Sequence, residues 1–261
     1  MNKDQLFQFA GIIPARYASS RFPGKPLVLI GNKTMIQRVY DQASKIIDEV
    51  WVATDDKRIF DAVTHFGGKA IMTSADHLSG TDRCAEAIKK INEETDKKLD
   101  IVVNIQGDEP FIKPEQIALL MKCFDDETVE LATLIRKVEP GEDVFNPNQP
   151  KVILDSKGNA IYFSRAAIPY IRDTERSDWS KKHVFYKHIG LYAYKSETLK
   201  NITSLTRSPL EISESLEQNR WIENGYRIRT AVTSWESISI DTPDDLERAK
   251  LLLKHFFKKY Y

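Results

Sequence analysis

Cysteine is scarce in this chain. Its 261 residues include two cysteines, Cys84 and Cys123, and both fall in segments with a helical pattern. Two thiols cannot build the disulfide framework that stabilises small secreted domains, so the sequence favours a reducing compartment. A chain of this length buries enough apolar surface to fold without a disulfide or a structural metal.

Long apolar runs and a secretory signal are also missing. No hydrophobic stretch approaches the roughly 20 residues that a helix needs to span a bilayer. Residues 1–17 lack a basic start, a long apolar core and a small-residue cleavage site. We therefore expect a cytoplasmic protein with no membrane insertion.

An excess of either charge is absent as well. The chain has 38 Lys and Arg residues against 38 Asp and Glu residues, which gives a formal net charge of zero. This balance argues against nucleic acid or an anionic membrane as the main partner. A small anionic ligand stays open, because it needs only a local cluster of positive side chains.

Segments typical of strands and helices alternate through the first half of the chain. The predicted strands cover 9–14, 50–53, 70–73 and 100–105, and the predicted helices cover 34–47, 57–66, 80–94 and 114–124. Such alternation indicates βαβ units, with a mostly parallel sheet and helices on both faces. We expect a three-layer αβα, Rossmann-like fold of the α/β class.

The second half has a different pattern. The segments 151–155 and 160–164 flank Ser-Lys-Gly-Asn, which predicts a hairpin. Further strands are expected at 185–194 and 227–232, helices at 209–224, and a last helix capped by Thr242 with Pro243 in its first turn. We expect a single domain over 1–261 that carries a β-rich insertion at about 145–225.

A basic loop follows the first predicted strand. Within 15–26 it contains Arg16, Arg21 and Lys25, together with serines and a glycine. Ligands of open parallel sheets bind beyond the carboxyl ends of the strands, and such a loop suits a polyphosphate. It is neither a Walker A loop, since Pro26 stands where Ser or Thr is required, nor a G-x-G-x-x-G turn. The alternative is a solvated basic loop paired with surface carboxylates.

Two acidic segments lie at predicted strand ends. Asp108 follows the strand at 100–105, after Gly107, and Asp241 is expected to end a strand before the last helix. If these ends are neighbours in one sheet, the two carboxylates can share a Mg²⁺ ion beside phosphates. The alternatives are a plain turn at Asp108 and favourable interaction with the helix dipole at Asp241.

A series of motifs spread over nearly the whole chain carries a family resemblance. They are IIPARYASSRFPGKPL (12–27), VATDD (52–56), ADHLSGTDR (75–83), NIQGDEP (104–110), FNPN (145–148), YFSRAAIP (162–169), KHIGLYAY (187–194), SPLE (208–211) and IDTPDDLERAK (240–250). In these motifs the sequence resembles the 3-deoxy-manno-octulosonate cytidylyltransferases, also called CMP-Kdo synthetases. Two departures are mild: Phe22 stands where Leu is common, and Asp82 where Glu is common.

The resemblance implies a nucleotidyltransferase fold similar to that of GT-A glycosyltransferases. It implies transfer of CMP from CTP to the anomeric hydroxyl of the acid sugar Kdo, with release of pyrophosphate, which activates the sugar for lipopolysaccharide synthesis. It also implies a requirement for Mg²⁺ and a homodimer. We expect direct in-line attack on the α-phosphorus, without a covalent enzyme intermediate, so that catalysis rests on positioning and charge neutralisation.

The matching motifs also imply roles for individual residues. Arg16, Ser19 and Lys25 would bind the CTP phosphates, with Lys25 nearest the α-phosphate, and Asp108 and Asp241 would bind Mg²⁺. Ser79, Gly80 and Gln106 would contact the nucleotide, and Gln106 also the sugar.

The implied sugar pocket consists of cationic, acidic and amide side chains. Its members would be Arg21, Gln106, Arg165, His188, Glu211 and Glu214. Arginine can hold the Kdo carboxylate, and Glu or Gln can accept hydrogen bonds from its hydroxyls. Each has an alternative: a core histidine at His188, a solvated helix face at Glu211 and Glu214, and a weak surface ion pair at Arg165.

Three other functions stay open. The first is a cytidylyltransferase for another acid sugar, such as sialate or an amino analogue of Kdo. The second is a GT-A glycosyltransferase, which also places carboxylates and a metal at strand ends. The third is a nucleotide-binding module without activity, against which the presence of both Asp108 and Asp241 argues.

Overall fold

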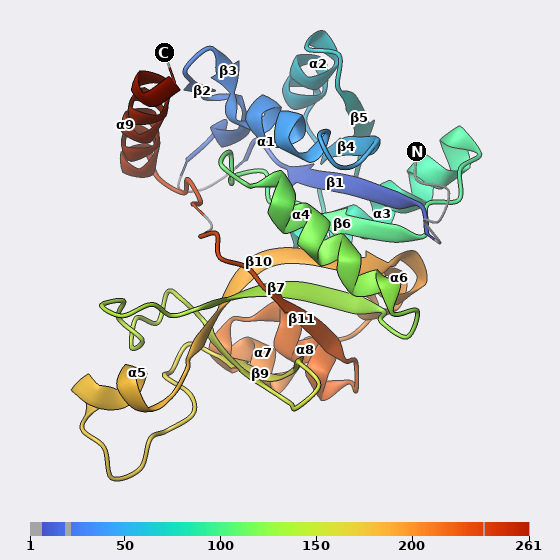
Figure 1. Cartoon of the computed structure of the whole chain (residues 1–261). Coiled ribbons are helices and arrows are strands. Elements are labelled where there is room, and N and C mark those ends of the chain that lie inside the picture. The colour runs from blue at the N-terminus through green and yellow to red at the C-terminus, as the bar shows by residue number, and fades with distance from the viewer. Residues whose placement is uncertain (1–6, 19–21, 237, 261) are drawn as a thin grey trace. The chain divides into compact units, whose positions relative to one another are not determined.

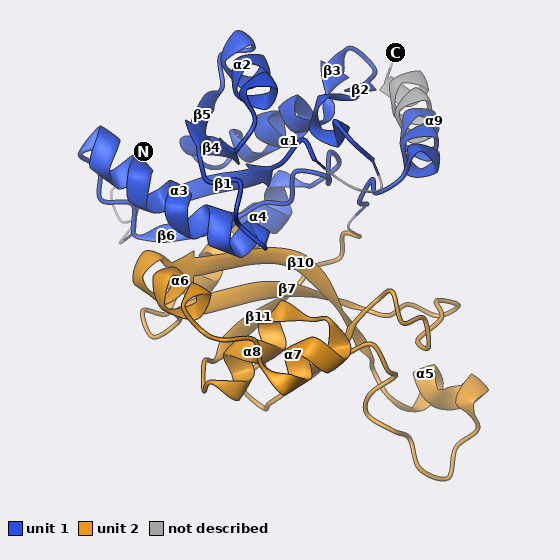
Figure 2. Ribbon diagram, turned by 180° about the vertical axis from the view of Figure 1, so that it is seen from behind, with its two compact units in different colours: residues 1–117, 237–261 blue, residues 118–236 orange. Residues whose placement is uncertain are grey.

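The computed structural model of the chain describes residues 7–18, 22–236 and 238–260, the last of these as backbone alone from 252 onward (Figure 1). The chain divides into two compact units (Figure 2). Unit 1 comprises 1–117 and 237–261, and unit 2 comprises 118–236. The insertion that we expected at about 145–225 falls inside unit 2, whose bounds are wider.

Unit 1 contains a parallel arrangement of strands. Its strands are β1 (Phe9–Ala15), β4 (Glu49–Thr54), β5 (Lys69–Met72) and β6 (Ile101–Asn104), in the order β5-β4-β1-β6, with a small hairpin of β2 (Leu29–Ile30) and β3 (Lys33–Thr34). The pairings of β1 with β4, of β1 with β6 and of β4 with β5 are all parallel. This is the arrangement that alternating strands and helices favour.

Helices cover both faces of these strands. They are α1 (Met35–Ala43), α2 (Lys57–His65), α3 (Gly80–Thr95) and α4 (Pro114–Met121), with the short 3₁₀ helix η1 (Lys25–Leu27). The last helix, α9 (Pro243–Tyr260), lies apart from these strands, beside the hairpin of β2 and β3. The two opposite views show α1 in front of the strands in one and α3 in front in the other. No helix among the described residues is long and apolar enough to cross a membrane.

Helix starts in unit 1 follow local side-chain chemistry. The hydroxyl of Thr34 accepts a hydrogen bond from the Gln37 amide at 3.3 Å and so caps α1. Ser79 and Asp82 form a reciprocal capping box at the start of α3. The carboxylate of Asp82 completes this box, so the departure from Glu at this position preserves the cap.

Two glycines allow close packing at the end of β1. A Cβ atom on Gly107 would lie 3.0 Å from the carbonyl oxygen of Pro14, and one on Gly80 would lie 3.1 Å from Pro14 Cγ. Only glycine lets the loop after β6 and the start of α3 approach the strand this closely. These two glycines therefore shape the carboxyl edge of the unit 1 strands.

Unit 2 has a mixed arrangement of strands. They are β7 (Leu131–Lys137), β8 (Lys151–Leu154), β9 (Asn159–Ser164), β10 (Tyr186–Lys195) and β11 (Ile228–Val232), in the order β10-β7-β11-β9-β8, and β8 also pairs with β10. Of these pairings, β11 with β7 is parallel and the others are antiparallel. The prediction of a mostly parallel central sheet thus does not describe unit 2.

The helices of unit 2 are short. They are α5 (Trp179–Lys182), α6 (Ser196–Thr203), α7 (Pro209–Glu214) and α8 (Glu217–Glu223), with 3₁₀ turns η2 (Lys122–Asp125) and η3 (Arg176–Asp178). The sequence analysis missed β7 and α6, and it placed the hairpin of β8 and β9 correctly.

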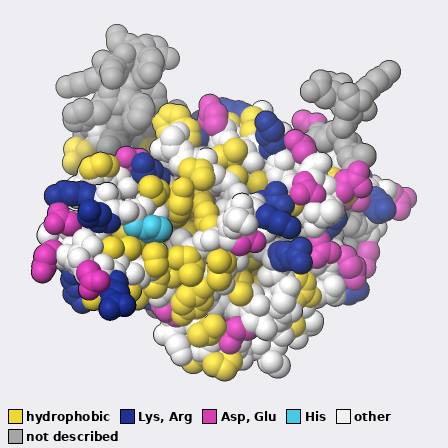
Figure 3. Space-filling view, turned by 60° about the horizontal axis from the view of Figure 1, so that its bottom comes forward, with side chains coloured by type: hydrophobic (Ala, Val, Ile, Leu, Met, Phe, Trp, Pro, Cys, Tyr) yellow, Lys and Arg dark blue, Asp and Glu magenta, His cyan; other side chains and the backbone are white. Residues whose placement is uncertain are grey.

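Figure 3 shows one face of the surface. Charged side chains of both signs are intermixed on this face, with hydrophobic side chains gathered between them.

The segment before α9 differs from the prediction. Residues 238–241 form no strand, so Asp241 does not end one. Instead the buried Ile240 donates its backbone N–H to the carbonyl oxygen of Asp108 at 2.9 Å. This one loop-to-loop hydrogen bond, rather than a sheet ladder, brings the two aspartates together.

Candidate active site

A cavity of about 250 Å³ lies at the carboxyl edge of the unit 1 strands. It is lined by Pro14, Ala15, Arg16, Lys25, Pro26, His77, Leu78, Ser79, Gly80, Arg83, Gln106, Gly107, Asp108 and Asp241. These residues come from the end of β1, the basic loop, the turn before α3, the loop after β6 and the segment before α9. This edge is where open α/β sheets bind their ligands.

Three charged side chains meet in the cavity. Lys25 Nζ lies 2.8 Å from Asp108 Oδ2 and 3.3 Å from Asp241 Oδ1. Their side chains are 15%, 28% and 35% exposed, respectively, so solvent reaches the group. One cation thus contacts both carboxylates at once, as the sequence analysis requires of a shared metal site.

The two carboxylates also fit the donor set of Mg²⁺. This ion takes oxygen ligands and is usually held by one or two carboxylates together with substrate phosphates and water. Among the described residues no three His, Cys, Asp or Glu side chains form a metal-binding group. The Asp108 and Asp241 pair would therefore hold the ion only in part and would leave positions for phosphate oxygens.

The backbone of the basic loop places Lys25. Gly24 has a φ of 72° and donates its amide to the carbonyl oxygen of Tyr17 at 3.0 Å, which closes the loop. The guanidinium carbon of Arg58 lies 3.3 Å from the centre of the Tyr17 ring, and this cation–π contact stabilises the position of the ring. Lys25 then begins η1 directly after the turn.

The other nucleotide candidates line the same cavity. Arg16 is exposed there, and Gln106 is half-buried. Ser79 and Gly80 form the start of α3, where backbone N–H groups and the helix dipole favour an anion.

Ser19 and Arg21, two further predicted site residues, lie outside the described residues. His77 and Arg83 also line this cavity, and the sequence analysis gave them no role.

In unit 2, Arg165 and Glu214 are joined to one another. Glu214 accepts hydrogen bonds from the Tyr162 hydroxyl at 3.0 Å, the Ser164 hydroxyl at 2.6 Å and the Arg165 backbone amide at 2.9 Å. Burial would raise the pKa of Glu214, but these hydrogen bonds lower it. The Arg165 guanidinium donates to the backbone carbonyl groups of Glu214, Pro147 and Ser215. Arg165 therefore holds three backbone carbonyl groups together, which a weak surface ion pair would not do.

Glu211 is buried rather than on a solvated helix face. It is 5% exposed and forms a capping box with Ser208 at the start of α7. Its two oxygens also contact the guanidinium of Arg220, at 3.1 Å and 3.0 Å. The structure therefore gives Glu211 a role in holding α7 to α8, and its contact with the sugar stays a prediction.

His188 lies on β10 among aromatic rings. Its ring centre is 5.1 Å from that of Phe163 and 5.2 Å from that of Tyr192, and its Nε2 lies 3.1 Å from the Thr133 hydroxyl. Burial lowers the pKa of His188 to about 3, so the imidazole is neutral at physiological pH. It can exchange hydrogen bonds with a ligand but supplies no charge.

A further polar group of unit 2 has no counterpart in the sequence analysis. Gln218 on α8 is 5% exposed, and its side-chain nitrogen has no hydrogen-bond partner among the described residues. A buried donor without a partner costs about 1–3 kcal/mol and marks a candidate ligand contact. No local pattern distinguishes Gln218 from the polar residues of an ordinary helix, so the sequence alone could not identify it.

Comparison with known proteins yields consistent matches. The Cytidylyltransferase family profile matches residues 10–230. The chain is 55% identical over 251 residues to a 3-deoxy-manno-octulosonate cytidylyltransferase of Bacteroides thetaiotaomicron, covering 95% of this chain and 99% of that protein. It is 57% identical over 240 residues to the protein of that name in Cytophaga hutchinsonii, covering 91% and 94%.

Solved structures agree with these matches. A CMP:2-keto-3-deoxy-manno-octonic acid synthetase complexed with CTP superposes with a TM-score of 0.87 at 42% identity, covering 95% of this chain and 99% of that one. A putative glucose-1-phosphate thymidylyltransferase from Bacillus anthracis has a TM-score of 0.61 at 19% identity, which shows a shared fold alone. The fold is therefore of the α/β nucleotidyltransferase type.

Proposed function

The chain belongs to the 3-deoxy-manno-octulosonate cytidylyltransferase family, and we propose that it transfers CMP from CTP to the anomeric hydroxyl of Kdo, forming CMP-Kdo and pyrophosphate. One observation carries this proposal. The catalytic residues expected from the family motifs, Arg16, Lys25, Asp108 and Asp241, all line one cavity of unit 1. The enzyme is a nucleotidyltransferase, and its substrates are the small molecules CTP and Kdo.

The proposed reaction is a single displacement at phosphorus. The anomeric oxygen of Kdo forms a bond to the α-phosphorus of CTP, and the bond from that phosphorus to the β-phosphate bridging oxygen breaks. The electron pair of the broken bond leaves with pyrophosphate, and the hydroxyl proton passes to solvent or to a carboxylate. Catalysis then consists mostly of positioning and of neutralising charge on the phosphates.

Lys25 and Arg16 supply positive charge in this scheme. Both line the cavity, and the Lys25 ammonium exchanges its contacts with Asp108 and Asp241 for a phosphate oxygen near the reacting phosphorus. Asp108 and Asp241 would hold Mg²⁺. When bound, the ion would polarise the phosphates and stabilise the charge that develops on pyrophosphate. Ser79, Gly80 and Gln106 would orient the nucleotide.

Unit 2 contains four of the six residues that we propose for contact with the sugar. Arg165, His188 and Glu214 carry a cation, a neutral ring and a carboxylate, which suit the carboxylate and hydroxyl groups of Kdo. Glu211 of unit 2, together with Arg21 and Gln106 of unit 1, completes the set expected from the family motifs. The homodimer, the cytoplasmic location and a role in lipopolysaccharide synthesis belong to the same proposal, and the family resemblance supports them.

The decisive experiment compares acid sugars. The purified protein is incubated with CTP, Mg²⁺ and either Kdo or sialic acid, and pyrophosphate and the CMP-sugar are both measured. We expect pyrophosphate and CMP-Kdo in equal amounts with Kdo, and neither product above background with sialic acid. Product formation with sialic acid alone would refute the assignment of Kdo.

A further inference from the structure

One wall of the cavity is a turn without regular structure. Residues 73–79 connect β5 to α3 and form neither helix nor strand. His77, Leu78 and Ser79 of this turn line the cavity, and Leu78 is 89% exposed. Because no ladder of backbone hydrogen bonds fixes the turn, its shape depends on side chains from other elements.

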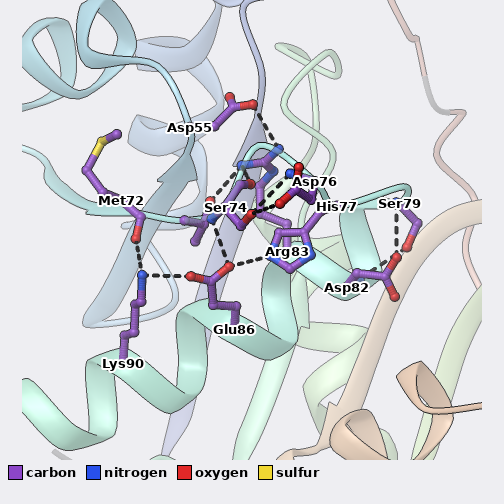
Figure 4. Close-up of polar contacts among 11 residues, drawn as sticks. Asp55, Met72, Ser74, Asp76, His77, Ser79, Asp82, Arg83, Glu86 and Lys90 are labelled. Atoms are coloured by element: carbon purple, nitrogen blue, oxygen red, sulfur yellow. Dashed lines mark hydrogen bonds and ion pairs between the residues drawn. The ribbon is translucent and has the colours of Figure 1, made fainter.

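Glu86 on α3, which is not among the residues that line the cavity, contacts this turn at two residues (Figure 4). Its Oε2 atom accepts the backbone N–H of Ser74 at 2.9 Å and forms a short contact with His77 Nε2. Its other oxygen, Oε1, lies 2.6 Å from the Nζ atom of Lys90, one helical turn farther along. One carboxylate thus connects both ends of the turn to a helix.

Arg83 provides a second attachment, at the start of the turn. It is 3% exposed, and its Nη1 donates to the Thr73 hydroxyl at 2.6 Å and to the Ser74 carbonyl oxygen at 3.2 Å. Its Nη2 lies 3.4 Å from Asp55 beyond the end of β4. Arg83 therefore orients Ser74, whereas Glu86 contacts both Ser74 and the His77 side chain.

Glu86 carries its negative charge at neutral pH. Burial would raise the pKa of this carboxyl, but hydrogen bonds from Lys90, the Ser74 amide and His77 outweigh it and hold the pKa at about 2. The carboxylate is 23% exposed, so solvent only partly weakens its contacts. A charged acceptor forms stronger hydrogen bonds than a neutral one, which suits a fixed anchor.

We infer that Glu86 is a positioning residue for the nucleotide: through Ser74 and His77 it holds the turn in the shape that the bound CTP requires. This inference rests on the proposed function, which places CTP in the cavity. Glu86 acts through the turn and stays away from the reacting phosphorus. Its loss therefore weakens CTP binding and leaves turnover at saturating CTP nearly unchanged.

The test compares three variants by isothermal titration calorimetry with CTP and by steady-state kinetics with CTP and Kdo. For Glu86→Ala we expect the Kd and KM for CTP to rise about tenfold, which corresponds to ~1.4 kcal/mol, while kcat changes less than about twofold. Glu86→Gln keeps one side-chain oxygen that can accept from the Ser74 amide and from His77, and should recover most of the affinity. Lys90→Ala is the matched control: it removes the third partner of Glu86 and a hydrogen bond to the Met72 carbonyl oxygen, but neither contact of Glu86 with Ser74 and His77. Its Kd should stay within about twofold of the wild type.

A second pair of variants tests the path through His77. The double variant carries both His77→Ala and Glu86→Ala. If Glu86 acts through His77, the Kd of the double variant for CTP should be no higher than the higher Kd of the two single variants. Fully additive losses would overturn the inference, as would wild-type CTP affinity in Glu86→Ala. A fall in kcat with unchanged affinity would also overturn it.

The readouts separate this inference from the proposed function. Calorimetry measures CTP binding without Kdo, so wild-type protein that binds CTP but forms no CMP-Kdo refutes the proposed function and still lets the Glu86 variants be judged. Wild-type protein that forms CMP-Kdo, combined with unchanged binding in Glu86→Ala, refutes the inference alone. Wild-type protein that does not bind CTP refutes both.

Discussion

The two units use their charged side chains differently. In unit 1, Lys25, Asp108 and Asp241 meet around a cavity and stay partly exposed. In unit 2, two ion pairs include at least one buried side chain. Glu211 pairs with Arg220, and Lys187, whose side chain is 4% exposed, pairs with Glu142. Solvated charges can exchange partners when a ligand arrives, whereas buried pairs are costly to separate.

This difference predicts two kinds of variant. Replacing a partly exposed cavity charge in unit 1, such as Lys25 or Asp108, should reduce activity and leave the fold intact. Replacing a buried charge in unit 2 should reduce stability first. The following experiments test this division, from the largest expected effect to the smallest.

Asp108→Asn should nearly abolish turnover. The change removes one of the two carboxylates that would hold Mg²⁺, and we expect kcat to fall on the order of 10³-fold, or ~4 kcal/mol. Pyrophosphate release measures this loss, and a thermal melt should show an unchanged Tm because Asp108 is partly exposed. A variant that keeps close to full activity with Mg²⁺ would contradict the metal assignment.

Glu211→Gln should destabilise the protein by about 3 kcal/mol, because it leaves the buried guanidinium of Arg220 with a weaker partner. Urea denaturation measures this loss. The matched control is Glu197→Gln, where an exposed pair with Lys200 is removed and about 0.5 kcal/mol or less is expected. A rise in KM for Kdo without loss of stability would instead support the sugar contact expected from the family motif.

Lys25→Met should lower kcat/KM on the order of 10²-fold, because a cation near the reacting phosphorus is lost. The same change frees both aspartates from their ammonium partner, so Mn²⁺ should bind more tightly in the absence of CTP. Kinetics and electron paramagnetic resonance of Mn²⁺ measure the two effects. Lys33→Met, which removes the exposed pair with Asp41, is the control. Unchanged Mn²⁺ affinity in Lys25→Met would show that Lys25 does not compete with the metal.

The buried His188 should make unit 2 sensitive to acid. Its pKa is lowered to about 3 in the folded protein, whereas the unfolded chain has the ordinary value of about 6.5. As the pH falls, the imidazole of the unfolded chain therefore takes up a proton before that of the folded protein does. The free energy of unfolding that is present above pH 6.5 is lost progressively as the pH falls towards 3. At pH 5 the loss from this one residue is about 2 kcal/mol.

Comparing wild type with His188→Gln isolates that effect. The difference in unfolding free energy between the two proteins should shrink by about 2 kcal/mol between pH 7.5 and pH 5, because the variant lacks the titrating ring. Urea denaturation at the two pH values measures it. A difference that does not change with pH would mean that the ring is protonated as readily in the folded state as in the unfolded chain.

Much of unit 1 could be predicted from the sequence. Its strands are buried apolar runs, and its helices carry a periodic apolar face with local caps, as in α1 behind Thr34 and α3 behind Ser79. Periodicity and capping act within a few residues, so a single segment contains the signal. The predicted end of α1 was too late, because residues 44–46 form a turn after Ala43.

Unit 2 was harder for a physical reason. The strand β7 pairs with β10 and β11, which lie tens of residues farther along the chain, and the sequence analysis missed β7. Strand preference follows context, and the pairings that fix β7 join segments far apart in the sequence. These long-range pairings hold β7 to later strands, and all of them fall within unit 2, which begins at 118.

By itself, the sequence determined the family and the α/β class and predicted the residues of the nucleotide site, because motifs and periodicity are local. Only the tertiary structure decided how those residues meet. Lys25 is 83 positions from Asp108 and 216 from Asp241, and a backbone hydrogen bond between loops, rather than the expected strand, brings the aspartates together. It also decided that Glu211 is buried against Arg220, since burial depends on the packing of elements that a local pattern does not describe.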